Sequence, residues 1–379
     1  MISFISILIA LSYSFLILGI ARGWKKMQTA TASSEPLRRV IVSVIIPARN
    51  EAGKIGSLIK EISNQQYPLT WMEVIVIDDD SDDTTCEEAS IEISKSPMDG
   101  EVIHLESTYS NTSPKKRALS TGIERAKGEL ILTTDADCHA GPLWVKTIVN
   151  HYLETKSAFI SGPVRQSPLT TVFSKIQALE FLSLVGSGAG AIGAGKALMC
   201  NGANLAFRKD DFLKVGGYEG NENYTSGDDV FLMMKLQKEF GSRAVSFVKN
   251  QEAIIDTEAQ TSWKGFLTQR IRWASKAKAY KTFYSIYTSG VVLLFNVLLL
   301  ASLPTLFLFP EYRNLIAILW GIKFASDASL LFPFTKFMKQ QKLMWFFIPS
   351  QLFVAFYISI AGFLGFSKSF SWKGRTFKK

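Results

Sequence analysis

Gly128-Glu129-Leu130-Ile131-Leu132-Thr133-Thr134-Asp135-Ala136-Asp137 is the stretch of sequence that decides the fold. An apolar run long enough for one buried strand ends abruptly in two carboxylates, Asp135 and Asp137. Parallel α/β sheets bind ligands at the carboxyl ends of their strands. Side chains at positions i and i+2 of an extended segment point the same way. Both carboxylates can therefore converge on one hard divalent cation, which would hold a diphosphate. We expect an enzyme that uses a nucleotide-linked donor.

The sequence on both sides of this stretch alternates short β-branched runs with helical stretches, between about residues 38 and 285. This alternation predicts an α/β fold with a mostly parallel sheet. The strand expected at residues 72–77 ends in a second acidic cluster, Asp78-Asp79-Asp80-Ser81-Asp82-Asp83, so two strands carry carboxylates to one edge of the sheet. The predicted elements are strands at residues 40–46, 72–77 and 102–105 and helices at residues 54–64 and 115–127.

Two further polar motifs lie in the second half of this region. The segment Asn201-Gly202-Ala203-Asn204 indicates a tight turn that enters a strand, with polar groups free to meet a ligand. The segment Ser226-Gly227-Asp228-Asp229 precedes an apolar helical stretch at residues 230–236. A carboxylate at a helix start is often a cap. We expect Asp228 to cap the helix and Asp229 to face a cleft as a general base.

The segment Gln269-Arg270-Ile271-Arg272-Trp273 lies shortly before an apolar block. On a helix, Gln269, Arg272 and Trp273 share one face. Arginine suits a diphosphate, and tryptophan offers a stacking surface to a sugar ring. The alternative interpretation is a basic and aromatic collar at a membrane surface.

A glycine run at residues 188–193 fits the dinucleotide pattern G-x-G-x-x-G, and residues 190–196 fit most of a P-loop. Ala197 stands where a P-loop has the Ser or Thr that binds magnesium. Both motifs also require a preceding strand, whereas an amphipathic helical stretch at residues 172–185 precedes the glycines. We therefore expect neither motif, and predict an interfacial helix over about residues 172–185 followed by a flexible loop.

The amino-terminal end is apolar and carries no charge over residues 2–20, and Arg22, Lys25 and Lys26 follow at once. The span suits a membrane helix, which needs about 20 apolar residues. A cleaved signal peptide would carry its basic residues before the apolar core and small residues at the cut. We expect an uncleaved anchor, with the following chain in the cytosol by the positive-inside rule.

Three more apolar blocks follow near the carboxyl end, at residues 286–309, 315–334 and 343–366. The middle block contains Lys323 and Asp327, which lie one helical turn apart and are expected to form a structural ion pair. Three full spans after a cytosolic domain would place the basic tail outside, against the charge rule. Either one block is re-entrant or interfacial and the tail is cytosolic, or the rule fails here.

The net charge of +9 is not taken as a sign of nucleic-acid binding, because much of the basic excess flanks the apolar blocks. Basic residues beside a membrane segment normally set its orientation or meet anionic lipid. The three cysteines, Cys86, Cys138 and Cys200, have no metal-binding spacing and fall in the expected cytosolic part. We therefore expect no disulfide.

The motifs resemble, in their order, those of the family 2 glycosyltransferases, inverting enzymes of the GT-A nucleotide-diphospho-sugar fold. The resemblance covers about residues 40–275, and the Gln269-x-x-Arg272-Trp273 motif is similar to that of membrane-embedded members such as cellulose and hyaluronan synthases and ceramide glucosyltransferases. The chain departs from the pattern at Asp80 and Asp82, where many relatives have Gly and a small residue. The motifs that carry the resemblance are residues 45–51, Asp78-Asp79, Lys115, Asp135-Ala136-Asp137, Gly202-Ala203-Asn204, Gly227-Asp228-Asp229 and Gln269-x-x-Arg272-Trp273.

The resemblance implies a role for each matching residue. Asp229 would be the catalytic base, and Asp135 and Asp137 would hold Mg²⁺ or Mn²⁺ on the donor pyrophosphate. The implied donor contacts are Pro47, Ala48, Arg49, Glu51, Asp78 or Asp79, Lys115, Asp135 and Arg272, and the implied acceptor contacts are Gly202, Asn204, Asp228, Gln269 and Trp273.

The resulting expectation is a metal-dependent inverting transferase in a bacterial inner membrane. It would move a sugar from a UDP-sugar, or a GDP-sugar, to a lipid or lipid-linked glycan at the cytosolic face. One alternative is a processive polysaccharide synthase, for which the membrane portion is small unless the protein forms homo-oligomers. The other is a non-catalytic donor-binding subunit. The expected parts are an anchor (residues 1–21), a linker (22–37), the GT-A domain (38–285), membrane or interfacial helices (286–367) and a basic tail (368–379).

Overall fold

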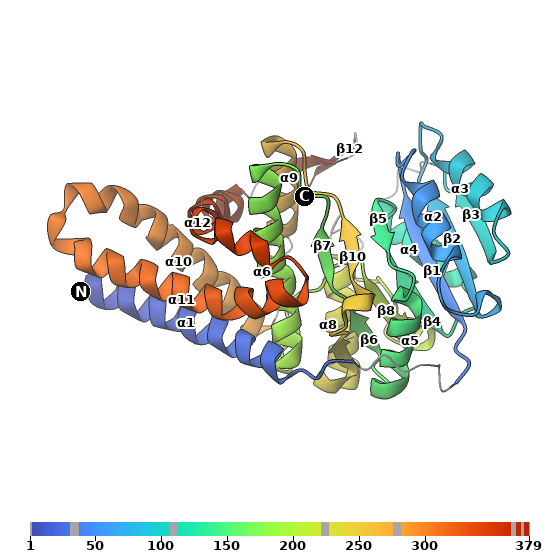
Figure 1. The fold of residues 1–379 in the computed structure, drawn as a ribbon, viewed down its shortest axis with the longest axis horizontal. Coiled ribbons are helices and arrows are strands. Elements are labelled where there is room, and N and C mark those ends of the chain that lie inside the picture. Colours follow the sequence, from blue (N-terminus) through green and yellow to red (C-terminus); the bar gives the residue numbers. More distant parts are fainter. Residues whose placement is uncertain are drawn as a thin grey trace.

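The computed structural model describes residues 2–30, 38–106, 113–220, 227–275, 282–364, 369–372 and 375–378. It has two parts, a sheet domain and a group of long helices that extends from it (Figure 1). The linker expected at residues 22–37 and the basic tail expected at residues 368–379 fall partly outside the described residues. Within the described part, the first helix, α1 (Ile2–Lys26), continues through the basic residues that were expected to begin the linker.

The sheet domain contains a mostly parallel sheet of seven described strands, as expected. β1 pairs in parallel with β2 and β4, and the register sets Ala48 opposite Asp78, so the carboxyl ends of β1 and β2 are level. β8 runs antiparallel to both of its neighbours. In spatial order the strands are β3 (Asp99–His104), β2 (Met72–Asp78), β1 (Val42–Ala48), β4 (Leu130–Thr133), β8 (Leu205–Arg208), β6 (Phe159–Ser161) and β9 (Val245–Phe247).

Helices cover both faces of this sheet because successive strand residues point to opposite sides. Ile45 faces a core that includes residues of α4 and α8, whereas Val44 and Ile46 face a core that includes residues of α2 and α5. Along β1 the buried residues are apolar except Ser43, whose hydroxyl donates to the buried Glu73 at 2.5 Å. A largely apolar strand is typical of a parallel sheet buried on two sides. The helices of the domain are α2 (Ile55–Ser63), α3 (Thr85–Ser94), α4 (Pro114–Arg125), α5 (Trp144–Thr155), α7 (Lys209–Lys214), α8 (Asp228–Phe240) and α9 (Trp263–Ala274).

A second, three-stranded sheet lies beside the carboxyl edge of the first. Its central strand, β10 (Ile255–Thr257), pairs antiparallel with β5 (Cys138–Ala140) and parallel with β7 (Val164–Gln166). β5 begins at Cys138, directly after Asp137, so its pairing in this small sheet fixes the loop that carries Asp135 and Asp137.

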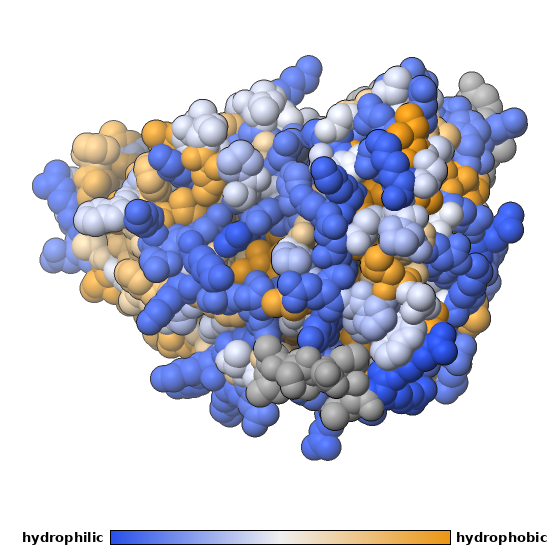
Figure 2. Space-filling view, turned by 45° about the vertical axis from the view of Figure 1, so that its right-hand side comes forward, coloured by the Kyte–Doolittle hydropathy of each residue, from blue (hydrophilic) through white to orange (hydrophobic). Residues whose placement is uncertain are grey.

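In the described part of the chain, five helices are long and apolar enough to cross a membrane, by length and composition. α1, α10 and α11 lie side by side and extend away from the sheet domain, while α6 stands between them and the sheet and α12 crosses the group obliquely (Figure 1). Hydrophobic surface gathers over this group, and hydrophilic residues cover most of the sheet domain (Figure 2). Besides α1, the five are α6 (Val172–Gly193), α10 (Phe283–Leu308), α11 (Arg313–Phe337) and α12 (Phe347–Leu364).

The glycine run corrects one expectation. It is not a flexible loop, because α6 continues through it to Gly193, and the predicted helix at residues 172–185 is therefore too short. The glycines let α1 approach α6 closely: a Cβ on Gly23 would lie 2.1 Å from the carbonyl oxygen of Gly190, and one on Gly190 would lie 2.4 Å from that of Ile20. Small residues serve this purpose in membrane helix pairs. The exclusion of a dinucleotide motif and a P-loop is confirmed, because Gly188, Gly190 and Gly193 lie inside α6 and the residues before them are helical instead of forming a strand.

The expected ion pair in α11 is confirmed. Lys323 Nζ lies 2.6 Å from an Asp327 carboxylate oxygen, and both side chains are buried or nearly so. Tyr13 of α1 completes the group, because its hydroxyl donates to Asp327 at 2.6 Å and accepts from Lys323 at 2.9 Å. Further along, Trp24 packs edge-on against Phe334 at 4.9 Å between ring centroids, so α1 and α11 run parallel over most of their length.

α12 takes a different course and stays near the sheet domain. Its residues Val354, Tyr357 and Ala361 pack with Phe266 of α9. The chain just before it is fixed to the sheet domain, since Arg165 donates to the carbonyl oxygen of Met338 at 2.9 Å. The short strand β11 (Ser369–Trp372), which follows α12 and pairs with β12 (Arg375–Lys378), packs beside α9.

Candidate active site

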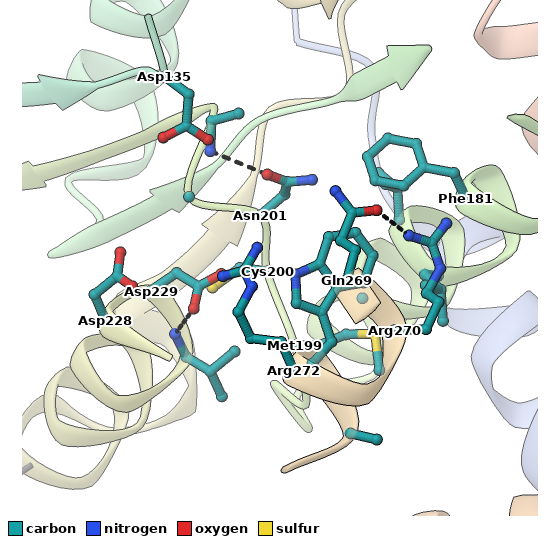
Figure 3. A pocket seen from close by; sticks show the side chains of 18 of the residues that line it. Asp135, Phe181, Met199, Cys200, Asn201, Asp228, Asp229, Gln269, Arg270 and Arg272 are labelled. Carbon is teal, nitrogen blue, oxygen red and sulfur yellow. Dashed lines mark hydrogen bonds between the residues drawn. The ribbon is translucent and has the colours of Figure 1, made fainter. Parts of the chain in front are cut away.

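A cavity of about 750 Å³ opens where the carboxyl ends of the parallel strands meet α8, α9 and the long helices. It brings together residues that are far apart in the sequence, including Asp135, Asp229 and Arg272 (Figure 3). Two of the predicted site residues, Asp78 and Asn204, are not among those that line it. The predicted residues that do line it are Pro47, Ala48, Arg49, Glu51, Asp79, Lys115, Asp135, Asp137, Gly202, Asp228, Asp229, Gln269, Arg272 and Trp273.

Asp135 and Asp137 both face the cavity, but not for the reason expected. β4 ends at Thr133, and the carbonyl oxygen of Asp135 accepts a hydrogen bond from the Cys138 backbone at 3.1 Å. The two carboxylates therefore lie on a turn and not on an extended segment. Hard oxygen donors of this kind suit Mg²⁺ or Mn²⁺, so the residues present fit a divalent cation.

Lys115 connects two of the acidic motifs. It follows Pro114, the first residue of α4, and its Nζ lies 2.5 Å from Asp135 and 4.0 Å from Asp228. Burial by itself would lower the pKa of Lys115, but the carboxylates of Asp135 and Asp228 outweigh burial and raise it above its usual range. The ammonium is thus held charged inside the cavity, where it can meet a second anion.

Asp228 and Asp229 form the first turn of α8, beginning from Gly227, which adopts a positive φ of 98°. The expected capping by Asp228 is wrong, because Gly227 is the cap residue and no side chain caps the helix. Asp229 accepts a hydrogen bond from the backbone N–H of Val230 at 2.8 Å, which fixes its carboxylate. A Cβ on Gly202 would lie 3.6 Å from Asp228, so the turn at Gly202 covers this pair closely. Ser226 lies outside the described residues.

Gln269, Arg272 and Trp273 lie on α9, and all three face the cavity as their helical spacing predicts. Burial lowers the pKa of Arg272, and the carboxylates of Asp228, Asp135 and Asp229 oppose that effect. A buried guanidinium beside these carboxylates balances part of their charge. It also offers a fork of N–H donors that matches a phosphate.

Sequence reasoning missed a buried charge cluster behind α9. Arg270 forms an ion pair with Glu180 of α6, with the two side chains 2% and 0% exposed. Tyr357 of α12 donates a hydrogen bond to the same carboxylate at 2.5 Å. The Arg270 guanidinium lies 4.4 Å from the ring centroid of Trp273 and also donates to Gln269. The cluster therefore joins three helices behind two predicted site residues. One available signal was a single acidic residue in the otherwise uncharged stretch at residues 176–193.

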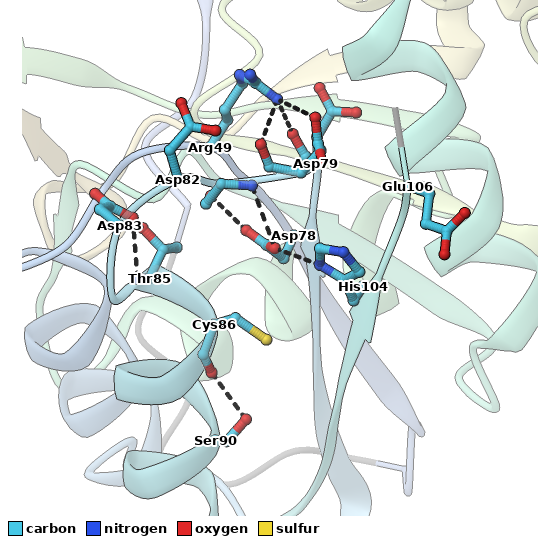
Figure 4. A network of polar contacts seen from close by, with 12 residues as sticks. Arg49, Asp78, Asp79, Asp82, Asp83, Thr85, Cys86, Ser90, His104 and Glu106 are labelled. Atoms are coloured by element: carbon cyan, nitrogen blue, oxygen red, sulfur yellow. Dashed lines mark hydrogen bonds and ion pairs between the residues drawn. The ribbon is translucent and has the colours of Figure 1, made fainter. Parts of the chain in front are cut away.

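Asp78 and Asp79 have separate positions. Asp79 lines the cavity and pairs with Arg117 at 3.1 Å. Asp78 is 1% exposed, accepts from Ser81, and lies 2.8 Å from the His104 ring (Figure 4). Arg49 donates to the backbone oxygens of residues 79 and 80 and so fixes the end of β2. Of the two aspartates offered by the sequence, Asp79 is the one placed to meet a ligand.

Asn204 is fully buried within the sheet domain instead of facing a ligand. Its side chain accepts from Trp144 at 3.0 Å and donates to the carbonyl oxygens of Pro163 and Ala253 at 2.9 and 2.8 Å. These bonds tie β8 to three neighbouring segments, which is a structural task. Asn201, three residues earlier, lines the cavity in its place.

Two family models match the chain. The model for glycosyl transferase family 2 matches residues 43–216, and the model for glycosyl transferase family group 2 matches residues 130–360, more than half of the chain. The chain belongs to glycosyl transferase family group 2. The family 2 match includes the quoted stretch, and both matches include the turn at Gly202.

Curated relatives match parts of the chain. A probable glycosyltransferase, YdaM of Bacillus subtilis, is 26% identical over 248 residues, which are 62% of this chain and 54% of the relative. The dodecaprenyl-phosphate galacturonate synthase of Rhizobium johnstonii is 27% identical over 120 residues, 31% of this chain and 34% of the relative. The chain thus spans about a third to a half of these relatives.

A solved structure shows the fold over nearly the whole chain. The mannosyltransferase PcManGT of Pyrobaculum calidifontis, in complex with GDP-Man and Mn²⁺, has a TM-score of 0.57 and 19% sequence identity. The similarity covers 95% of this chain and 99% of that one. The sheet domain therefore has the GT-A fold, as the resemblance of the motifs implied, with apolar helices at both ends.

Proposed function

We propose that the protein is a membrane-bound inverting glycosyltransferase that moves a sugar from a nucleotide-diphospho-sugar, such as a UDP-sugar, to a lipid or lipid-linked glycan. The observation that carries this proposal is the cavity, which joins the acidic edge of a GT-A sheet to helices long enough to cross a membrane. A relative named for dodecaprenyl phosphate supports a lipid as the acceptor.

The donor would lie over the carboxyl ends of β1, β2 and β4. Pro47, Ala48, Arg49, Glu51 and Asp79 line the part of the cavity next to β1 and β2, where the nucleoside would bind. Lys115 and Arg272 would neutralise the leaving diphosphate, since fixed cations in a buried site stabilise developing negative charge. A divalent cation held by Asp135 and Asp137 would add charge neutralisation at the same group.

Asp229 would act as the general base. The acceptor hydroxyl gives its proton to the Asp229 carboxylate and its oxygen bonds to the anomeric carbon, while the bond from that carbon to the diphosphate breaks. A single displacement of this kind, which forms no covalent intermediate with a second carboxylate, inverts the configuration. Gly202, Asn201, Asp228, Gln269 and Trp273 would surround the acceptor.

The sheet domain would be cytosolic. α1 and α11 run parallel over most of their length, whereas α12 stays beside α9 and β11 follows it there. We therefore assign α12 as the block that does not cross the bilayer, which places the basic tail on the side of the sheet domain, in agreement with the charge rule. Cysteine labelling from outside the cell tests this assignment, and a strongly labelled tail would contradict it.

The central experiment is Asp229→Asn in the full-length protein, purified in detergent and supplied with UDP- and GDP-sugars, Mn²⁺ and a lipid extract. Loss of a general base lowers the rate by about 10²–10⁴, while binding of the donor nucleotide should persist. Asp210→Asn, which changes an exposed aspartate of α7 outside the cavity, is the control. Undiminished transfer by Asp229→Asn would refute the base, and products that stay in the aqueous phase would indicate a polysaccharide synthase.

A further inference from the structure

The candidate active site has a second end whose chemistry differs from the first. Beyond Trp273 the cavity continues between three of the long apolar helices, α6, α10 and α12, of which α12 is the one that we assign to the membrane surface. Most of the lining side chains here are aliphatic or small, the polar ones being the hydroxyls of Thr288, Ser289 and Tyr357, and none of the lining residues that α6, α10 and α12 contribute is a carboxylate. The walls include Val185 and Gly188 of α6, Ile286, Gly290 and Leu293 of α10, and Ala361 of α12. We call these six residues the apolar arm.

A nucleotide-sugar does not explain the apolar arm. Its phosphates and hydroxyls would lose hydration there without gaining hydrogen bonds, at a large cost in free energy. A hydrocarbon chain, by contrast, gains free energy for each methylene group that leaves water, about 0.8 kcal/mol. One ligand with a polar head and a long chain fits both ends of the same cavity.

We propose that the apolar arm holds the hydrocarbon chain of a lipid acceptor whose head lies at Asp229, and that this chain leaves the protein between α10 and α12. This inference rests on the proposed function and adds the acceptor's class and its route. The lipid reaches the site sideways from the membrane, and the donor reaches it from the sheet side.

The glycines of the two helices define the width of the route. A Cβ built on Gly290 meets no heavy atom within 4 Å, so space is open at this point of α10. On the opposite wall, a Cβ on Gly362 would lie 2.5 Å from a methyl carbon of Leu293, so the two helices are in close contact there. The space beside Gly290 is therefore closed off where Leu293 meets Gly362, and the passage between α10 and α12 is narrow enough for a single hydrocarbon chain.

A second direction is unfavourable for a hydrocarbon chain. A smaller cavity of about 120 Å³ shares Thr288, Val292 and Tyr357 with the first, and continues toward α1 and α11. Its walls include Glu180, Lys323 and Asp327. A chain placed there would displace polar contacts from charged groups, so the route between α10 and α12 is preferred.

The test fills the open space. Gly290→Leu and Gly290→Trp place side chains of increasing size in the route, and Gly321→Leu and Gly321→Trp are matched controls. Gly321 lies on α11, is exposed, and its Cβ also meets nothing within 4 Å. The probe is hexadecanol carrying a diazirine, added to the full-length protein in detergent, with labelled peptides mapped by mass spectrometry. Binding of UDP and GDP with Mn²⁺ is measured in parallel.

We expect labelling of peptides that contain Ile286, Leu293 and Ile358 in the wild type. This labelling should fall at least tenfold, relative to exposed α11 peptides, in Gly290→Trp, and less in Gly290→Leu. The Gly321 variants should match the wild type, and nucleotide binding should not change. Equal labelling of the arm in Gly290→Trp and Gly321→Trp would overturn the route; if Gly290→Trp fails to fold, the Leu pair decides. Absence of nucleotide binding in the wild type would instead contradict the proposed function.

Discussion

The buried ion pair between Glu180 and Arg270 is expected to contribute strongly to the free energy of unfolding, and Glu180→Gln tests this. Glu180→Gln keeps the shape of the side chain but removes its charge, and leaves the Arg270 guanidinium buried without a counter-ion. Breaking a buried pair in this way costs about 3–5 kcal/mol, because the remaining charge stays out of water. The pair is 2% and 0% exposed, so solvent cannot screen the loss.

The assay is thermal unfolding of the full-length protein in detergent, together with the kinetics of sugar transfer. Arg270 contacts Gln269 and Trp273, so Glu180→Gln should also raise the acceptor KM while donor binding changes little. Glu239→Gln is the matched control, because Glu239 pairs with Lys214 at 3.2 Å with both side chains about half exposed. Exposed pairs are worth about 0–1 kcal/mol.

The double variant Glu180→Leu with Arg270→Met removes both charges at once. Replacement of a whole buried pair by apolar groups is often nearly neutral, so the double variant should be more stable than Glu180→Gln alone. If Glu180→Gln unfolds at the same temperature as Glu239→Gln, the assignment of a buried, uncompensated charge is wrong.

Two further predictions concern stability. Burial lowers the pKa of His151 from 6.5 to about 4; the unfolded chain therefore binds a proton that the folded protein excludes, and stability falls as the pH drops from 6.5 to 4, by about 3 kcal/mol in total. Unfolding midpoints between pH 7.5 and 5 should show a weaker pH dependence in His151→Gln, and equal slopes would contradict this origin. Gly23→Leu should destabilise the protein by about 1–3 kcal/mol, because its side chain meets the α6 backbone, whereas Gly19→Leu, whose Cβ meets nothing within 4 Å, should be tolerated. Similar melting of the two glycine variants would refute the close approach of α1 and α6.

The sequence predicted the sheet because its signals are local. Neighbouring residues in the sequence show which side chains of β1 face each core and which carboxylates follow β2 and β4. Parallel pairing then brings the carboxyl ends of these strands to one edge of the sheet. The family motifs added Lys115, Asp229 and Arg272, which the structure brings to one cavity. Their roles in catalysis stay predictions.

Other features depend on partners that no local pattern names. Gly190 looked like part of a loop because glycine weakens helices, yet its lack of a side chain serves contact with α1, about 170 residues earlier in the chain. Asn204 matches a residue of the family motif, but its side chain forms hydrogen bonds with Trp144, Pro163 and Ala253 inside the domain. Arg270 occupies an x position of the Gln269-x-x-Arg272-Trp273 motif, so the motif did not indicate its buried ion pair with Glu180.

The contact of Tyr13 with Lys323 and Asp327 has a consequence for how the protein is made. Tyr13 is synthesised some 310 residues before Lys323, so α1 can complete this contact only after α11 has been made. A leader segment from another protein, equally long and apolar, would still hold the chain at the membrane. It would leave a lysine and an aspartate of α11 without their hydroxyl partner, and it would lack the glycine that fits α6. In this protein the amino-terminal helix is an assembly surface, and domain-swapped chimaeras that exchange it should insert but fail to mature.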